Sequence, residues 1–341
     1  MKIEIICGAG SQNGVHLSDL HGVNNRIGVG GSEYALLTMC EAWTKRGDEV
    51  VLYNNPTRDD GVFEQRDVNE FSRSDKRDVL IAFREPTTNV LQSNGKKVFW
   101  SCDQFTTGDF RQFSEYVDQT VTISPFHTKY FKTNYNIDAT DIDLPVRIWE
   151  YDESAEKIPN RLIFTSVPDR GLDTVAKTFA KIVQRVPDAS LVITSDYRLW
   201  GSNSPGNSHF MTRFLQTPNV HFLGAISRKR LVEEQQKAQI HYYPFNGQTE
   251  ELFCVAVAES QVAGVLPITS TDGALETTNM GVLIEGSAKD QRNHQIFVNK
   301  TIEYLASPDL PNIQNSLKEK ARERFDVNRI LSEWDEKIFN G

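Results

Sequence analysis

The chain is poor in the features that mark secreted and membrane-spanning proteins. Its 341 residues contain only four cysteines, scattered with no CxxC pair, and the longest apolar run, residues 252–258, has seven residues. Scattered cysteines argue against a disulfide framework or a zinc site, and a run of this length is too short to span a bilayer. No basic-then-apolar signal segment opens the chain. We therefore expect a cytoplasmic protein, in a bacterial cell or, if the source is viral, in the host.

Positive charge is also scarce. Lys and Arg number 37 against 46 Asp and Glu, which gives a formal charge of −9 and an isoelectric point near 5.4. Non-specific nucleic-acid binders are usually basic because they gain affinity by releasing counterions. The charge therefore disfavours a nucleic-acid partner and leaves small anionic ligands open.

Short β-branched runs alternate with helical patterns along the chain, in two series. The first series has runs at residues 2–7, 50–53, 79–83, 97–100 and 121–124, and the second at 162–165, 191–194, 220–223, 240–243, 267–270 and 282–284. Alternating strands and helices predict parallel sheets covered by helices. The fold class is thus α/β with two Rossmann-like domains, which we place at residues 1–150 and 151–318. Residues 315–339 predict two helices broken near Asp326, and we assign 319–341 to a C-terminal helix that packs back on the first domain.

Two glycine-rich segments could bind an anion. Gly30 and Gly31 precede an amphipathic pattern at residues 33–46, and a helix N-terminus offers unpaired N–H donors and partial positive charge. The alternative is an ordinary loop with Ser32 as the helix N-cap. The second segment, residues 8–14, misses the dinucleotide pattern G-x-G-x-x-G because Asn13 stands where the third glycine belongs. A nicotinamide dehydrogenase is therefore a weak interpretation.

Three charged residues of the second domain could carry chemistry. Arg170 lies between a predicted strand and its helix, where it could clamp a diphosphate. Glu251 and Glu259 are separated by seven residues, and a helix from Leu252 onward would place them on nearly the same face. Glu259 interrupts an apolar helix, and a carboxylate placed there needs a partner. Solvated surface charges are the alternative for all three.

These segments resemble one family, the retaining nucleotide-sugar glycosyltransferases of the GT-B fold, family 4, which includes glycogen synthase-like and group 1 transferases. Their signature is Glu-x7-Glu within a longer frame, which Glu251, Phe253, Glu259 and Gly264 follow, while Cys254 replaces a glycine. Residues 272–284, 30–33 and 324–334 resemble the family's next turn and strand, its N-domain loop and its C-terminal helix. The resemblance covers the whole chain and implies two domains that face each other across a cleft.

The resemblance implies a donor nucleotide sugar, with UDP favoured, held mainly by the second domain. Glu259 would bind the ribose hydroxyls, Glu251 would face the transferred sugar, and Arg170 with Gly30 and Gly31 would hold the diphosphate. Backbone N–H groups of Leu252, Phe253 and Cys254 would hold sugar hydroxyls, and the base would lie near Gly224. Transfer would proceed with retention and need neither metal nor cofactor.

The sequence departs from the family at two places. Thr165 stands where many members carry a second cation, for which Lys229 and Arg230 are candidates, although a solvated charge run explains them better. The family's N-domain histidine has no obvious equivalent, so Asp103 is our choice for a polar contact at the reaction centre.

The acceptor is not identified by these residues. Ser32, His127 and His21 are acceptor-side candidates, with a capping or structural role as the alternative for His127. Residues 11–27, 54–78 and 105–115 are the predicted acceptor loops. A saccharide, small molecule, protein or modified nucleic-acid base all stay open, as does a monomer or homodimer.

Two alternatives compete with this interpretation. A metal-dependent GT-A transferase would need an Asp-x-Asp pair, which Asp141 and Asp143 provide. They lie, however, in residues 141–160, which are polar and acidic, carry Pro145 and Pro159, and predict the linker between the domains. A catalytically inactive sugar-nucleotide-binding protein is the other alternative, and the intact Glu251 and Glu259 pair argues against it.

Overall fold

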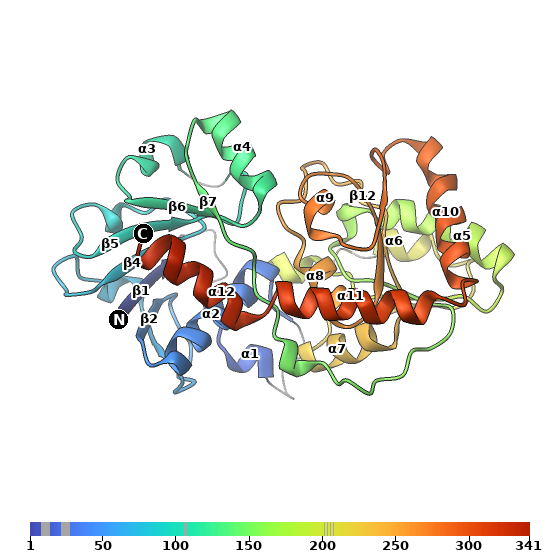
Figure 1. Ribbon diagram of the computed structural model, residues 1–341, viewed down its shortest axis with the longest axis horizontal. Helices are drawn as coiled ribbons and strands as arrows, with labels where there is room; N and C mark the ends of the chain where they lie inside the picture. Colours follow the sequence, from blue (N-terminus) through green and yellow to red (C-terminus); the bar gives the residue numbers. More distant parts are fainter. Residues whose placement is uncertain are drawn as a thin grey trace. The chain divides into compact units, whose positions relative to one another are not determined.

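A computed structural model describes residues 1–7, 14–21, 28–105, 108–200, 202, 204, 206 and 208–341. Within these residues the chain forms two compact units. Unit 1 comprises Met1–Leu20, Val29–Pro145 and Asp326–Gly341, and unit 2 comprises His21–Gly28 and Val146–Phe325. Each unit is built around its own parallel sheet (Figure 1).

Unit 1 contains a seven-stranded parallel sheet in the order β3-β2-β1-β4-β5-β6-β7. Its strands are β1 (Lys2–Cys7), β2 (Glu49–Tyr53), β3 (Glu64–Arg66), β4 (Val79–Phe83), β5 (Lys96–Trp100), β6 (Gln119–Thr122) and β7 (Thr140–Asp141). The helices are α2 (Gly31–Arg46), α3 (Phe110–Ser114), α4 (Pro125–Tyr135) and α12 (Val327–Trp334). The short α1 (Ser18–His21) belongs to unit 1 up to Leu20, and its last residue is counted with unit 2. Central strands such as β4 are buried throughout, as expected for a sheet covered on both faces.

The C-terminal helix α12 packs on α2, so the end of the chain belongs to unit 1 (Figure 1). Trp334 makes edge contacts with Trp43 of α2 and Trp100 of β5, at centroid distances of 5.4 and 5.2 Å. The break before α12 is Asp326, whose carboxylate accepts the N–H groups of Asn328 and Arg329. A capping carboxylate of this kind starts a new helix, which explains why the tail bends at the expected residue.

Unit 2 contains a six-stranded parallel sheet in the order β10-β9-β8-β11-β12-β13. Its strands are β8 (Arg161–Phe164), β9 (Ser190–Ile193), β10 (Val220–Phe222), β11 (Ile240–Tyr243), β12 (Leu266–Ser270) and β13 (Val282–Ile284). Its helices are α5 (Leu172–Arg185), α6 (Ser208–Thr212), α7 (Arg228–Lys237), α8 (Val255–Val262), α9 (Leu275–Thr278), α10 (Gln291–Leu305) and α11 (Leu310–Arg324). One apolar core joins the sheet to α5 and α10 through side chains such as Phe179 and Phe297.

The predicted fold class, two Rossmann-like domains with a C-terminal helix that returns to the first, is confirmed. Two edge strands were missed, β3 and β7. Both are short, polar and only half-buried for most of their length, so they lack the apolar pattern that predicts a strand.

The helix expected from Leu252 begins at Val255, because Cys254 adopts a left-handed backbone with φ 74°. The alternative that Ser32 caps α2 is wrong, because the N-cap is Gly30 and Ser32 lies one residue inside the helix. Lys229 and Arg230 lie in the first turn of α7, which Ser227 caps.

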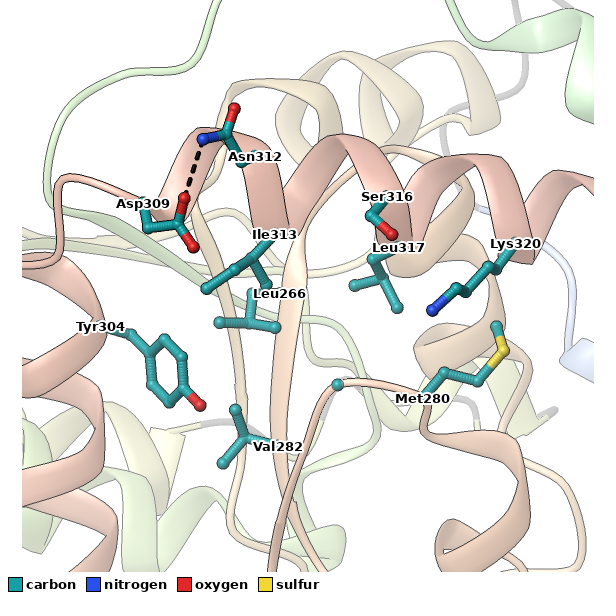
Figure 2. A pocket seen from close by; sticks show the side chains of 11 residues that line it. Leu266, Met280, Val282, Tyr304, Asp309, Asn312, Ile313, Ser316, Leu317 and Lys320 are labelled. Carbon is teal, nitrogen blue, oxygen red and sulfur yellow. Dashed lines mark hydrogen bonds between the residues drawn. The ribbon is translucent and has the colours of Figure 1, made fainter.

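A cavity of about 350 Å³ lies in unit 2 beside α11 (Figure 2). It is lined by Leu266 and Val282, the first residues of β12 and β13, and by Asp309 and Lys320 of the α11 region. Ligands of open α/β sheets bind at the opposite, carboxyl ends of the strands. The cavity is therefore separate from the site described next.

Candidate functional site

Two loops meet at the centre of the unit 2 sheet. The strand order changes direction between β8 and β11, which pair in parallel, and ligands of open α/β folds bind at the carboxyl ends of strands at such a point. Arg170 follows β8 and Glu251 follows β11, and the guanidinium Nη1 lies 3.2 Å from the carboxylate Oε1. The fold thus brings together two of the three predicted residues of this domain.

Glu251 is buried and held by several groups. The Tyr243 hydroxyl donates a hydrogen bond to its Oε1 at 2.5 Å, and burial, followed by the charge of Glu251, raises the pKa of Tyr243 well above its usual value. Tyr243 therefore remains a donor. The charge of Glu251 in turn raises the pKa of Arg170, and the Arg170 guanidinium also lies over the Phe245 ring. Glu251 and Arg170 thus form a salt bridge whose two partners are also held by Tyr243 and Phe245.

Two glycines allow this close approach of loops. Gly171 has φ 137°, and a Cβ there would lie 2.5 Å from the Pro244 carbonyl oxygen. Gly273 has φ 62°, and a Cβ there would collide with the Glu251 carbonyl oxygen, which accepts the Ala274 N–H at 2.8 Å. Only glycine fits such positions, so the turn at residues 272–276 packs directly against the Glu251 backbone and holds it in place.

The segment from Leu252 to Cys254 leads directly into the N-terminus of α8. Leu252 and Phe253 are buried, and Cys254 is the helix N-cap. Cys254 stands at the family's glycine position, and its positive φ shows why glycine suits that position. Burial is the main cause that raises the pKa of the Cys254 thiol well above its usual value, so the thiol stays neutral.

Glu259 lies within α8 and is 5% exposed. Arg228 Nη1 donates to its Oε1, and Gln235 Nε2 donates to Oε2 at 3.5 Å. Burial raises the pKa of Glu259, and the charge of Arg228 opposes that rise. The partner that a buried carboxylate at this position needs is therefore Arg228, which the sequence did not identify. Arg230 instead pairs with Glu234.

Gly224 follows β10 with φ 66°. The next residue, Ala225, donates its N–H to Asp196 Oδ2 at 3.0 Å, and Arg198 pairs with the same carboxylate. Asp196 follows β9. The loop predicted to lie near the base is thus fixed by an adjacent carboxylate at the carboxyl ends of the strands.

In unit 1, Gly30 and Gly31 open the 16-residue helix α2. Gly30 carries no capping side chain, and its carbonyl accepts the Tyr34 N–H at 2.9 Å. Ser32 is half-buried in the first turn. The N-terminus of a helix of this length favours an anion, which is consistent with the predicted role of the two glycines.

A second arginine cluster lies beside that helix. Arg84, directly after β4, donates to Asp103 from Nε at 2.8 Å and from Nη2 at 3.0 Å, and to Glu33 of α2 at 2.6 Å. Arg84 therefore holds both oxygens of the carboxylate that we had chosen for the reaction centre. No sequence signal pointed to Arg84, because its partners come from two other segments of the chain.

His127 is fully buried at the start of α4. Its Nδ1 accepts the Ile123 N–H at 3.4 Å, so its Nε2 donates to the Asp103 carbonyl at 3.0 Å, and burial lowers its pKa to about 3. In this structure His127 is shielded from solvent and holds the Asp103 backbone through this hydrogen bond.

The predicted acceptor-side residue His21 is only partly described. It is the last residue of α1, and its side chain lies outside the described part of the structure. The predicted acceptor loops 11–27 and 105–115 are described only in part. His16, by contrast, is fully buried between Gln65 and Thr57.

The described residues contain neither a metal-binding cluster nor a membrane-spanning helix. No three or more His, Cys, Asp or Glu side chains in that part of the chain are grouped to hold a metal ion. Asp141, of the Asp-x-Asp pair, lies in the edge strand β7. Among the helices of the same residues, none is long and apolar enough to cross a membrane.

The unit 2 sequence matches a known family of transferases. Residues 159–324 match the family model of glycosyl transferases group 1. A curated relative is the GDP-mannose-dependent monoacylated alpha-(1-6)-phosphatidylinositol monomannoside mannosyltransferase of Corynebacterium glutamicum, 26% identical over 231 residues. The match covers 59% of this chain and spans 58% of the length of that relative.

Solved structures match the whole chain. The sucrose-phosphate synthase of Thermosynechococcus elongatus superposes with a TM-score of 0.73 and 13% identity over 99% of both chains. HepE of Anabaena, in complex with UDP-glucose, superposes with a TM-score of 0.71 and 15% identity over 100% of both chains. The two-domain fold is therefore that of the GT-B glycosyltransferases, and residues 159–324 of the second unit are similar to the group 1 glycosyl transferases.

Proposed function

We propose that this protein transfers a sugar from a nucleoside-diphosphate sugar to an acceptor hydroxyl, with retention of anomeric configuration and without a metal ion. The observation that carries the proposal is the ion pair of Arg170 and Glu251 at the switch point of the unit 2 sheet. That pair lies inside the segment that matches the group 1 glycosyltransferase model. Its two charges suit the two ends of such a donor, because a guanidinium binds phosphate oxygens and a carboxylate accepts sugar hydroxyls.

Arg170 is assigned to the diphosphate. As the bond between the anomeric carbon and the diphosphate oxygen breaks, negative charge builds up on the leaving diphosphate, and a fixed cation stabilises it most at that moment. The contacts of Arg170 with Glu251 and the Phe245 ring hold the guanidinium in place before the donor binds. We also propose that Gly30 and Gly31 contact a phosphate group of the donor.

Glu251 is assigned to the transferred sugar and Glu259 to the ribose. A carboxylate offers about four acceptor positions in total, so each glutamate keeps acceptor capacity beside its arginine. The segment of Leu252, Phe253 and Cys254 lies between them in sequence and carries backbone donors toward the start of α8. Hydroxyl groups of the sugar are the natural acceptors for those donors.

The donor base and sugar require a screen. UDP is favoured, and the HepE structure contains UDP-glucose, whereas the curated mannosyltransferase is named for GDP-mannose. The acceptor is assigned to unit 1, where Asp103 is the proposed polar contact through the part of its carboxylate that Arg84 leaves accessible. Asp103 is 22% exposed at its side chain.

A thermal-shift screen against UDP, GDP, ADP, TDP and CDP and their sugars, with and without EDTA, tests the proposal. A ligand that binds the native state raises the melting temperature. We expect a selective shift that EDTA leaves unchanged, and NMR of a transfer product should show the anomeric configuration of the donor. Absence of any nucleotide shift would contradict the proposal, and a shift that EDTA abolishes would contradict its metal independence. Tight binding with neither transfer nor hydrolysis would instead indicate an inactive binding protein.

A further inference from the structure

A chain of ion pairs connects Glu259 to the segment that precedes β8. Arg228 donates from Nη1 to Glu259 and from Nε to Glu150 at 2.7 Å. Glu150 in turn accepts from Arg147 Nε at 2.6 Å. The Arg147 side chain is fully buried, and those of Arg228 and Glu150 are 7% and 15% exposed. These four residues alternate in charge, so every buried charge has an opposite neighbour.

Polar side chains fix the orientation of this chain. The Tyr151 hydroxyl lies 3.2 Å from Arg228 Nη2 and donates to Gln235 Oε1 at 3.0 Å. Gln235 donates back to Glu259 Oε2. Arg228 is also the first residue of α7, whose start is set by the Ser227 cap. The guanidinium therefore has one position, and Glu259 is held at both of its oxygens.

Charged groups on other elements contact α8 at places other than Glu259. At the C-terminal end of α8, Arg322 of α11 donates to the Val262 carbonyl and Lys157 donates to the Ala263 carbonyl. Lys318 of α11 pairs with Glu153. His241 of β11 binds Ser260, and burial lowers its pKa to about 3, so it is uncharged. Arg228 is thus the cation in direct contact with Glu259 among the groups that face it.

We propose that Arg228 is a positioning residue for donor binding, which keeps Glu259 ionised and oriented toward the ribose while Arg147 and Glu150 hold Arg228 in place. The inference rests on the proposed function of Glu259. Neither the Glu-x7-Glu motif nor the predicted cations include Arg228. A buried carboxylate without a charged partner takes up a proton, and a protonated Glu259 is a poorer acceptor for ribose hydroxyls. Loss of Arg228 should therefore act on donor affinity in a manner that depends on pH.

Calorimetric titration of Arg228→Met with UDP, and with GDP, between pH 6.0 and 8.5 tests this inference. The wild type should bind one of them with an affinity that changes little over this range. For the variant we expect affinity about tenfold or more below wild type at pH 6.0, recovering as the pH rises and Glu259 ionises. Arg292→Met, which removes an exposed arginine that pairs with Asp290, is the control and should bind like the wild type.

A cycle with Glu259→Gln separates positioning from a purely structural role. If Arg228 acts through Glu259, the Arg228→Met change should have no further effect on UDP affinity once residue 259 is a neutral amide. The double variant also removes the unpaired buried charge, so it remains measurable even if Arg228→Met alone folds poorly. Arg228→Lys keeps a cation beside Glu259 and should therefore retain most of the wild-type affinity at pH 6.0.

The outcomes distinguish this inference from the proposed function. If the wild type binds none of UDP, GDP, ADP, TDP and CDP, the proposed function fails and the inference falls with it; if it binds one of the last three instead, that nucleotide replaces UDP in the titration. If the wild type binds but Arg228→Met matches it at every pH, or weakens binding equally with and without Glu259→Gln, the inference is wrong while the proposed function stands.

Discussion

Arginine side chains neutralise carboxylates at the carboxyl ends of both sheets, but the two units arrange them differently. In unit 1 a single guanidinium, that of Arg84, serves both Glu33 and Asp103. In unit 2 Arg170 pairs with Glu251, and Arg228 pairs with Glu259 and also with Glu150, which has Arg147 as a second cation. The unit 1 cluster thus keeps an excess of negative charge, and the unit 2 pairs are balanced.

This difference agrees with the proposed division of labour. A diphosphate is attracted to cations that are not outnumbered by carboxylates, which favours the unit 2 loops. A neutral acceptor rich in hydroxyl groups suits a site with spare carboxylate oxygens, which the unit 1 cluster provides. The following variants test whether the arginines of the two units differ in role as well as in arrangement.

The largest effect is expected at Arg170 in unit 2. Arg170→Met should lower kcat by about 100- to 1,000-fold, because the lost cation acts mainly on the leaving diphosphate, and should weaken UDP binding far less. Steady-state kinetics together with calorimetry measure both quantities. Arg213→Met, which removes the cation paired with Asp173, is the matched control. Equal losses in turnover and affinity would show that Arg170 holds only the ground state.

In unit 1, loss of the Arg84 guanidinium should lower the free energy of unfolding and not only turnover. Arg84→Met leaves Glu33, whose side chain is 4% exposed, without its cation, and breaking such a buried pair costs about 3 kcal/mol of unfolding free energy. Urea unfolding followed by tryptophan fluorescence suits this test, because Trp43, Trp100 and Trp334 lie in unit 1. Adding Glu33→Gln should recover part of the loss. Unchanged stability of Arg84→Met would mean that the cluster has no structural role.

A smaller effect is expected from one buried histidine in each unit. Burial lowers the pKa values of His127 and His241 to about 3, below the value of about 6.5 in an unfolded chain. The unfolded state therefore binds more protons, and stability falls as the pH drops from about 6.5 toward 3, by about 1.4 kcal/mol per pH unit for each histidine. Unfolding free energies of His127→Gln and His241→Gln between pH 7 and pH 5 should each show a shallower slope than wild type. An unchanged slope would place that histidine in a solvated or ionised state.

The sequence predicted best what depends on local patterns. Apolar runs located β1, β4 and β11 at their observed bounds, and the polar strands β3 and β7 escaped because they lack such runs. The motif spacing located Glu251 and Glu259. It could not reveal Arg228 or Arg84, because their partnerships join residues 31 and 51 positions apart and only the folded chain brings them together. The start of α8 depended on a positive φ at Cys254, which residue type alone did not indicate.

The central claim is that Glu251 and Glu259 have separate roles in donor binding. Calorimetric titration of Glu251→Gln and Glu259→Gln with UDP and with the nucleotide sugar selected by the thermal-shift screen measures those roles. Glu259→Gln should weaken both ligands by the same factor, because both carry the ribose. Glu251→Gln should leave UDP affinity unchanged and remove only the additional affinity that the sugar provides. If Glu251→Gln weakens UDP as much as Glu259→Gln does, or if Glu259→Gln leaves UDP affinity unchanged, the assignment of the two carboxylates is wrong.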